Sequence, residues 1–577
     1  MKHRSRFVFL LVALVATTVS VAAGMQPERA ENGMVASVHV LASQAGVDMM
    51  KAGGNAIDAA VATGFALAVV HPSAGNIGGG GFMLIRTQDG QTKFIDFREK
   101  APGKATATMY QDKDGNVVPS LSRLGYLAVG VPGSVKGLVH AQAHYGKLTL
   151  KQVMAPAIRL AREGYVLDWS DARQMSNDAG LAQFADSKRI FQNGGKGWKQ
   201  GDVFRQPDLA RTLERIVAAP DDFYTGRMAR ELAEFMQRGG GLITVDDLRN
   251  YDVKERTPVR GTYRGLEVIS APPPSSGGIA LIETLNILEG FDIARAGFGS
   301  AESIHLISES YRRAFYDRAQ YLGDPEFSDL PVLELADKPY AVEWRKSIDP
   351  QRASVSSRLE RPRVSKKLEQ YANDKPVKGA GKEPTQTTHY SVVDKDGNAV
   401  AVTTTLNGGY GSKVTAGPLG FLLNNEMDDF SSKPGAPNMF GLLQSEENAV
   451  GPNKRPLSAM TPTIVLKDGK LWLVLGSPGG PTIITTVANI LIGVADFGLD
   501  IQQAVNAPRF HHQWVPDRII MERNRFSPDT IRLLEQRGHA VSFGLGGDGE
   551  CIQIDLETGL RLGASDGRND SGRAVGY

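Results

Sequence analysis

The chain has 577 residues, of which 41% are hydrophobic and 22% charged, and its formal net charge is +2. These values are close to the averages of globular proteins, so they argue against a disordered chain and leave ample apolar material for a core. No block of basic residues is present, so nothing indicates nucleic acid as a partner.

The first residues have the layout of a secretory signal peptide. Lys2, Arg4 and Arg6 give a positive start, residues 7–19 are almost wholly apolar, and small residues follow up to Gly24. The alternative is a membrane anchor, but the apolar run is too short to span comfortably. We predict a signal peptide over residues 1–24, a soluble mature protein without a membrane partner, and a periplasmic or secreted location.

The next segment predicts a helix pair followed by two paired strands. Residues 43–70 have helical spacing broken by Gly53 and Gly54, and a run of glycines at 78–81 follows. A phosphate-binding loop is one interpretation of that run, but no Gly-Lys-Ser/Thr comes after it. Strands are expected over residues 82–86 and 93–97. They place Arg98 just beyond a strand end, where its side chain can be held rigidly over a cleft.

Residues 132–250 are predicted to be mostly helical, and another strong helix is expected over residues 303–322. We interpret the charged residues of this second helix as a solvated or ion-paired face rather than a site. They are Glu309, Arg312, Arg313, Asp317 and Arg318.

A polar stretch over residues 350–385 separates this helical half from a strand-rich half. Strands are predicted over 389–394 and 399–406 with a turn at 395–398, which is a β-hairpin. Cleavage between Gln386 and Thr387 would give Thr387 a free α-amine beside its hydroxyl, and such a residue is its own nucleophile and base. The alternative is an ordinary threonine-rich strand start.

The remaining segments supply one further candidate and three features that we set aside. Strands over 463–467 and 470–475 precede Gly479 and Gly480, which lead into a helix over 482–494. Residues 544–549 match a dinucleotide-binding spacing, but the strand-like run after them indicates a hairpin turn. The pair at 511–512 lacks metal-ligand spacing, so no metal is expected. The single cysteine, Cys551, cannot form an intramolecular disulfide and is interpreted as buried and inert.

Several of these motifs together resemble the γ-glutamyltranspeptidases, and most closely the bacterial periplasmic members. The resemblance covers nearly the whole chain after about residue 30. It is carried by residues 74–82, 96–99, 386–406, 423–431, 451–458 and 476–480.

The resemblance implies a fold and a division of the chain. The family belongs to the N-terminal-nucleophile hydrolases, so we expect an α+β fold with a four-layer αββα sandwich. The precursor is expected to cleave itself before Thr387, which gives a large subunit over residues 25–386 and a small subunit over residues 387–577. The two subunits would stay together as a heterodimer, and no cofactor is expected.

The resemblance also implies roles for individual residues. Thr387 is the nucleophile and Thr405 hydrogen-bonds its hydroxyl, although a plain β-former is the alternative for Thr405. The backbone N–H groups of Gly479 and Gly480 would form an oxyanion hole. The groups expected to bind a glutamyl donor are Arg98 and Ser458 for the α-carboxylate, and Asn407, Glu426 and Asp429 for the α-ammonium. The alternative for Arg98 is a structural ion pair with Glu99 or another acid.

Three positions depart from the family pattern. Ala459 stands where well-known bacterial members have a second serine, so one hydroxyl contact to the carboxylate is missing and we expect weaker glutamyl affinity. Phe440 replaces a frequent tyrosine and can exclude water without donating a hydrogen bond. Glu426 replaces a frequent glutamine.

The predicted activity is transfer of the γ-glutamyl group of glutathione or a similar donor, with cysteinylglycine leaving, to an amino acid, a peptide or water. The first alternative is a cephalosporin or glutaryl acylase on the same scaffold, whose substrates lack the α-amino group; Asp429 argues against it. The second is a non-catalytic periplasmic binding protein, which would never split. The intact Gln386–Thr387 junction argues against that alternative.

Overall fold

The computed structural model describes residues 25–362, Leu368 and residues 387–577. The predicted signal peptide and Gln386, one half of the predicted cleavage site, lie outside the described residues. None of the described helices is long and apolar enough to cross a membrane.

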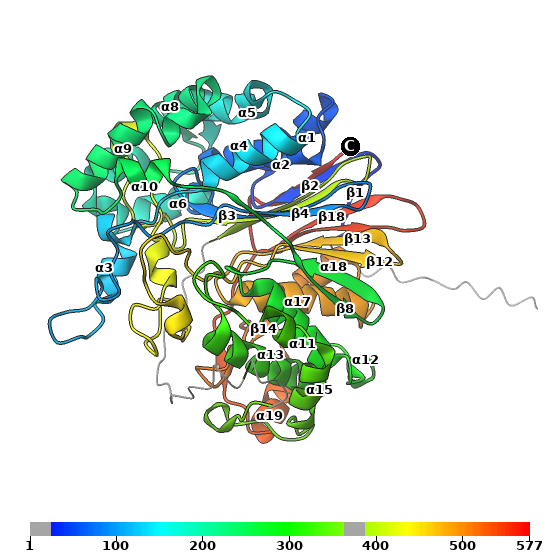
Figure 1. Cartoon of the computed structure of the whole chain (residues 1–577). Coiled ribbons are helices and arrows are strands. Elements are labelled where there is room, and N and C mark those ends of the chain that lie inside the picture. The colour runs from blue at the N-terminus through cyan, green and yellow to red at the C-terminus, as the bar shows by residue number, and fades with distance from the viewer. Residues whose placement is uncertain (1–24, 363–367, 369–386) are drawn as a thin grey trace, which may run out of the picture.

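Two seven-stranded sheets form the centre of the molecule (Figure 1). The first sheet has the order β1 (Glu28–Ala30), β18 (Arg561–Ser565), β17 (Glu550–Ile554), β13 (Lys470–Leu475), β12 (Thr463–Lys467), β9 (Leu266–Ser270) and β8 (Val259–Tyr263). The second has the order β19 (Arg573–Gly576), β2 (Met34–Ser37), β10 (Thr388–Val393), β11 (Ala399–Thr405), β3 (Gly80–Arg86), β4 (Thr92–Asp96) and β7 (Lys254–Arg256). Every pairing within the two sheets is antiparallel.

The predicted hairpin is the centre of the second sheet. Strands β10 and β11 pair from Thr388 opposite Thr404 to Val393 opposite Ala399. Because side chains alternate along a strand, Tyr390 and Val392 pack into the helical layer, whereas Val393 packs between the sheets. Both faces of the hairpin are therefore buried, which explains its high content of β-branched residues.

One helical layer covers each sheet on its outer side, so the layers follow the order αββα (Figure 1). On the second sheet lie α1 (Val40–Lys51), α2 (Ala56–Val70) and α4 (Ser134–Tyr145), while α5 (Leu150–Glu163) packs on α2 and α8 (Pro207–Ala218) packs on α5. On the first lie α11 (Gly277–Leu288), α13 (Ala301–Tyr321), α15 (Lys338–Lys346), α17 (Thr482–Ala495) and α18 (Ile501–Asn506). This confirms the expected α+β class and four-layer sandwich.

Further described helices and strands lie around the sandwich. The other helices are α3 (Pro119–Arg123), α6 (Trp169–Asn177), α7 (Ala185–Phe191), α9 (Arg227–Arg238), α10 (Val245–Arg249), α12 (Ile293–Ala296), α14 (Val332–Leu335) and α19 (Pro528–Gln536). The other strands are β5 (Tyr165–Val166), β6 (Val203–Phe204), β14 (Phe510–His511), β15 (Ile519–Met521) and β16 (Val541–Phe543).

The glycine-rich run at 544–549 leads into strand β17, as predicted, and not into a helix. The predicted hairpin turn is wrong, because the strand before the run, β16, pairs with β15 in the three-stranded sheet, whereas β17 pairs with β13 and β18. Cys551 in β17 is buried, as predicted. Burial raises the pKa of its thiol to about 12. The five charged residues that the sequence analysis singled out on α13 are buried rather than solvated, and Glu309 pairs with Arg312 at 3.2 Å and with Arg313 at 2.8 Å.

Candidate active site

The free end of the central hairpin brings two threonines together. Thr387 precedes β10 and Thr405 ends β11, and their Oγ1 atoms are 3.4 Å apart. Both residues are buried. The Oγ1 atom of Thr405 also accepts a hydrogen bond of 2.7 Å from the backbone N–H of Asn407, whose φ of +73° turns the chain away from the sheet. The Thr405 hydroxyl is thereby fixed beside that of Thr387.

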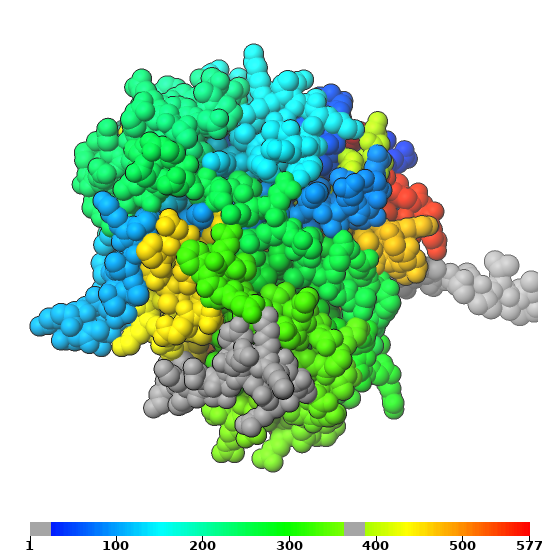
Figure 2. All heavy atoms as spheres, viewed as in Figure 1, coloured from blue at the N-terminus to red at the C-terminus, as the bar shows by residue number. Residues whose placement is uncertain are grey.

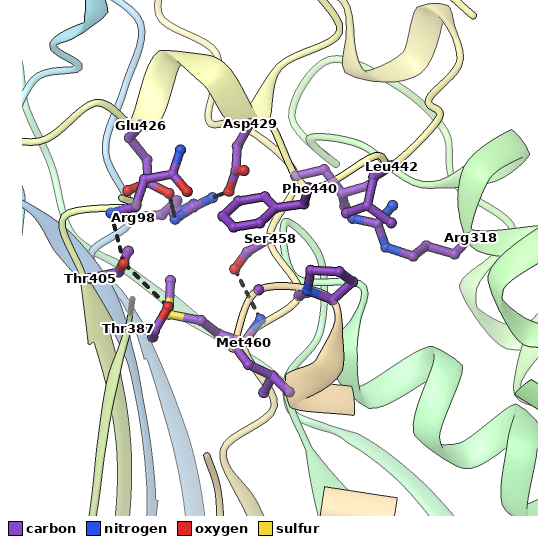
Figure 3. A pocket seen from close by; sticks show the side chains of 16 residues that line it. Arg98, Arg318, Thr387, Thr405, Glu426, Asp429, Phe440, Leu442, Ser458 and Met460 are labelled. Atoms are coloured by element: carbon purple, nitrogen blue, oxygen red, sulfur yellow. Dashed lines mark hydrogen bonds and ion pairs between the residues drawn. The ribbon is translucent and has the colours of Figure 1, made fainter. Parts of the chain in front are cut away.

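These two threonines line a cavity, and the empty space within it and at its mouth is about 320 Å³ (Figure 3). Segments far apart in the sequence contribute to it, including the ends of β4 and β11 and the turn before α17. The lining residues are Arg98, Arg318, Thr387, Thr405, Asn407, Glu426, Asp429, Phe440, Leu442, Leu457, Ser458, Ala459, Met460, Gly480, Pro481 and Ile483. All predicted site residues within the described part of the chain lie here, except that Gly479 is one residue outside the lining.

One end of the cavity holds a cluster of buried charges. The guanidinium of Arg98 bonds to Glu426 through Nη1 and to Asp429 through Nη2, while Nε donates to the carbonyl of Pro456 at 3.2 Å. Glu99 lies 3.7 Å from Nη1. Arg98 therefore forms structural ion pairs, which was the alternative to a carboxylate-binding role. Its partners, Glu426 and Asp429, are two of the residues expected to bind the α-ammonium.

Burial controls the protonation of this cluster. It raises the pKa of Glu99 to about 7 and raises the pKa of Glu426 and Asp429 as well, although Arg98 acts in the opposite direction. Burial disfavours the charge of Arg98 too, but the neighbouring acids outweigh it and raise its pKa. A cation beside several acids complements a ligand that carries one carboxylate and one ammonium.

The turn before α17 exposes backbone donors. Gly479 has a φ of +134° and Gly480 a φ of +56°, which are conformations that favour glycine. The carbonyl of Gly479 accepts from the N–H of Thr482 at 3.1 Å and from its hydroxyl at 2.7 Å. Within the described residues, neither glycine N–H donates to a protein acceptor. Free donors at a helix N-terminus suit an oxygen that becomes negative during a reaction.

Ser458, Ala459 and Met460 form another part of the cavity lining. The Ser458 hydroxyl accepts from the N–H of Met460 at 3.1 Å, and its carbonyl accepts from the hydroxyl of Ser276 at 2.6 Å. Ala459 lines the cavity beside it with a methyl group in place of a hydroxyl.

Phe440 lies against the glycine turn and belongs to a loop at the molecular surface. A Cβ atom at Gly480 would stand 2.8 Å from its ring, so the two residues are in close contact. Figure 2 shows the chain around residues 430–450 (yellow) beside the segment that follows β4 (blue), and the side chain of Gln111 donates to the carbonyl of Ser432 at 2.8 Å. This loop covers the cavity with apolar side chains.

Arg318 is the charged lining residue that the sequence analysis did not place at the site. The sequence pattern groups Arg318 with the charged face of its helix, but its Nε donates to the hydroxyl of Ser276 at 2.9 Å and it lines the cavity. One signal was available. Arg312 and Arg313 have Glu309 three or four residues away, whereas the positions three and four residues from Arg318 are Ala314, Phe315, Tyr321 and Leu322.

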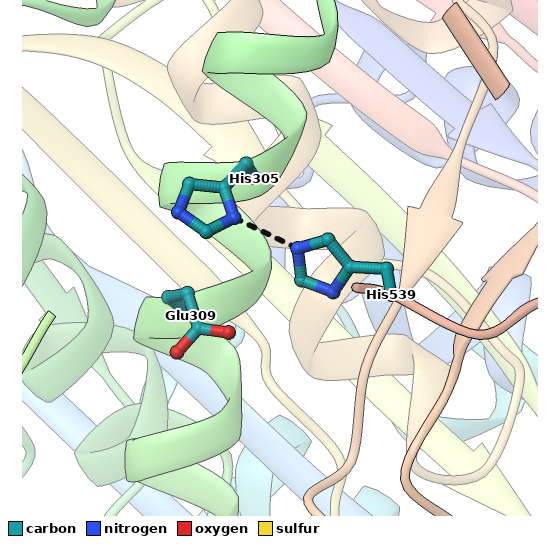
Figure 4. Close-up of side chains that lie close together, drawn as sticks. All are labelled: His305, Glu309 and His539. Atoms are coloured by element: carbon teal, nitrogen blue, oxygen red, sulfur yellow. Dashed lines mark hydrogen bonds between the residues drawn. The ribbon is translucent and has the colours of Figure 1, made fainter. Parts of the chain in front are cut away.

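A second cluster of potential metal ligands lies outside this cavity (Figure 4). His305 Nδ1 is 2.8 Å from His539 Nε2, and His305 Nε2 is 2.8 Å from the carbonyl of Asp349. The nearby carboxylate of Glu309 is already bonded to Arg312 and Arg313. The cluster therefore forms a hydrogen-bonded network that ties α13 to the segment after α19, although His539 Nδ1 is buried without a hydrogen-bond partner among the described residues.

Comparisons with known proteins agree on one family. The γ-glutamyltranspeptidase family model matches residues 42–576. The glutathione hydrolase proenzyme of Escherichia coli K12 is 50% identical over 555 residues, which cover 96% of this chain and 93% of that protein. The acylase ACY 1 proenzyme of Pseudomonas sp. SE83 is 38% identical over 89% of this chain and 88% of that protein.

Solved structures give the same fold. The cephalosporin acylase from Bacillus halodurans has a TM-score of 0.82 at 27% identity and covers 98% of this chain and 99% of that one. A chain of Helicobacter pylori γ-glutamyltranspeptidase has a TM-score of 0.56 at 45% identity and covers 57% of this chain and 95% of that one.

Proposed function

Because the chain belongs to the γ-glutamyltranspeptidase family, we propose that it is a self-cleaving enzyme that transfers the γ-glutamyl group of glutathione and related amides to amino acids, peptides or water. The observation that carries this proposal is the position of Thr387. Its hydroxyl lies 3.4 Å from that of Thr405, in a cavity that also holds a buried cation and several acids.

The first reaction is cleavage of the precursor. The Thr387 hydroxyl attacks the carbonyl of Gln386, the peptide bond to the Thr387 nitrogen breaks, and an ester forms in its place. Water then hydrolyses the ester, which restores the hydroxyl and leaves a carboxylate on Gln386. The products are the large subunit, residues 25–386, and the small subunit, residues 387–577. The match of a Helicobacter pylori enzyme chain to 57% of this chain supports this division.

The second reaction is acyl transfer. The freed α-amine of Thr387, with an ordinary pKa near ~8, takes the hydroxyl proton as Oγ1 attacks the γ-carbonyl of the donor. The N–H groups of Gly479 and Gly480 stabilise the oxyanion, the leaving amine takes a proton, and a γ-glutamyl ester remains. An acceptor amine or water then attacks the ester. Thr405 orients the nucleophile throughout.

The charged cluster recognises the donor. Arg98 and Ser458 bind the α-carboxylate, and the α-ammonium is taken by Asn407, Glu426 and Asp429. Phe440 excludes water from the ester.

The acylase alternative has support from the acylases among the similar proteins. A glutaryl chain has a carboxylate for Arg98 but no ammonium, so it would leave Asp429 without a ligand partner. Two buried acids beside Arg98 therefore favour the glutamyl donor over the glutaryl one. The non-catalytic alternative predicts an uncut chain.

We also propose that the protein is exported. Residues 1–24 would direct the precursor to the periplasm or the medium before the two subunits form.

The test compares the wild type with Thr387→Ala on a denaturing gel and in an assay with γ-glutamyl and glutaryl anilides. We expect two bands and γ-glutamyl preference for the wild type, with residue 387 as the new N-terminus. The Thr387→Ala variant should be a single inactive band. A fully active uncut chain would refute the mechanism.

A further inference from the structure

Arg318 is a buried cation without a counter-ion. It is 2% exposed, its Nε donates to Ser276, and its Nη1 is buried with no hydrogen-bond partner. Among the described residues no acid forms an ion pair with it. Burial lowers its pKa to about 10, although the charge of Asp429 acts in the opposite direction. A guanidinium buried without a counter-ion is costly, and a bound anion would offset that cost.

Arg98, the other cation of the cavity, has counter-ions. Arg98 has Glu426, Asp429 and Glu99 around it, so its charge is already balanced in the unliganded pocket. The positive charge that remains available to an incoming anion is therefore that of Arg318. Figure 3 shows the two arginines on opposite sides of Phe440, with both lining the same cavity.

A short hydrogen-bond chain places Arg318 at the Ser458 end of the cavity. Its Nε donates to the hydroxyl of Ser276 at 2.9 Å, and that hydroxyl donates to the carbonyl of Ser458 at 2.6 Å. This is the wall where Ala459 offers a methyl group instead of a hydroxyl.

We propose that Arg318 is a specificity-determining residue that binds the α-carboxylate of the donor together with Ser458 and Arg98. The inference rests on the proposed function and assigns a further contact within the same site. Arg318 then supplies the charge-assisted hydrogen bond that residue 459 cannot make, and it recognises the carboxylate of the donor but not its ammonium.

The test uses donors that differ only in these two groups. The γ-glutamyl anilide has both, the glutaryl anilide keeps only the carboxylate, and the 4-aminobutanoyl anilide keeps only the ammonium. In Arg318→Gln we expect kcat/KM to fall roughly 10- to 100-fold for the first two, mainly through KM, and to stay within about twofold for the third. Arg318→Lys keeps the charge and should recover part of the loss.

A matched control separates binding from folding. Arg312 is a buried arginine of the same helix that does not line the cavity, so Arg312→Gln should change kcat/KM for all three donors by the same factor. Subunit bands on a gel verify that each variant has matured. If the 4-aminobutanoyl anilide turns over too slowly, competitive inhibition by glutamate and by 4-aminobutanoate gives the same comparison.

Equal losses for all donors in Arg318→Gln, or an unchanged inhibition constant for glutamate, would overturn the inference. Failure of the proposed function looks different, because the wild type would then cleave no γ-glutamyl anilide at all.

Discussion

Substitution of Gly479 by alanine tests the proposed oxyanion hole most directly. The φ of +134° at this residue is a conformation that side-chain-bearing residues rarely adopt. A Cβ atom there would stand 2.4 Å from the hydroxyl oxygen of Thr482, which is itself bonded to the Gly479 carbonyl. The turn must therefore change its backbone angles, and the Gly479 N–H must leave its present direction.

The expected size of the effect follows from what that donor does. Loss of one oxyanion donor typically lowers kcat by ~10²–10³, which corresponds to about 2.7–4 kcal/mol of transition-state stabilisation. The carbonyl of the bound donor is uncharged, so its ground-state binding should change little. We therefore expect kcat to fall by that factor while KM stays within about threefold.

The measurement is steady-state hydrolysis of a γ-glutamyl anilide by matured Gly479→Ala enzyme. Gly469 provides the matched control, because its φ is +74° and a Cβ atom there would meet nothing within 4 Å. Gly469→Ala places an alanine at a positive φ in the β12–β13 turn, outside the cavity lining, and should leave kcat unchanged. A rise in KM at constant kcat in Gly479→Ala would refute the oxyanion role, and so would equal losses in both variants.

Three further predictions concern the nucleophile and the charged cluster. Thr405→Val removes the hydroxyl beside Thr387 and should lower kcat roughly tenfold, whereas Thr405→Ser should not; equal rates for both variants would contradict this. Asp429→Asn should raise KM roughly 10-fold or more for a γ-glutamyl anilide but not for a glutaryl one, and a parallel rise would mean that Asp429 does not bind the ammonium. Because burial raises the pKa of Glu99 to about 7 and also those of its neighbouring acids, the cluster gains negative charge as pH rises. The ratio of kcat/KM for γ-glutamyl over glutaryl anilides should therefore increase between about pH 6 and 8, and a flat ratio would exclude this titration.

Much of the fold could be predicted because the decisive signals are local. The helices Ser134–Tyr145 and Leu150–Glu163 lie in the region 132–250, which was predicted to be mostly helical. The hairpin strands begin and end within one residue of the prediction, because alternation and turn residues lie within a few positions of one another.

The site residues are brought together by pairing between strands that are distant in sequence, and no local sequence pattern predicts that pairing. Strand β11 pairs with β3, so Thr405 lies opposite Gly80 although more than three hundred residues separate them in sequence. Arg98 and Glu426 meet only because this pairing brings their segments together. The family resemblance identified Arg98 and Glu426 as site residues. Arg318 lies in none of the motifs that carry that resemblance, so the sequence predicted only that it lies on a solvated or ion-paired face of its helix.

Side chains alternate between the two faces of the hairpin, and this leads to a prediction about Thr387 and Thr388. Thr388 is paired with Thr404 inside the sheet, and its position in β10 places it on the same face as Tyr390, toward the helical layer. Its hydroxyl is buried without a hydrogen-bond partner. A one-residue shift of the cleavage site would therefore deliver a nucleophile to the wrong face of the sheet. In Thr387→Ala we expect no cleavage before Thr388 and no rescue of activity, as measured by intact-mass spectrometry after long incubation. A fragment that starts at Thr388 and hydrolyses the anilide would show that the face of the strand does not select the nucleophile.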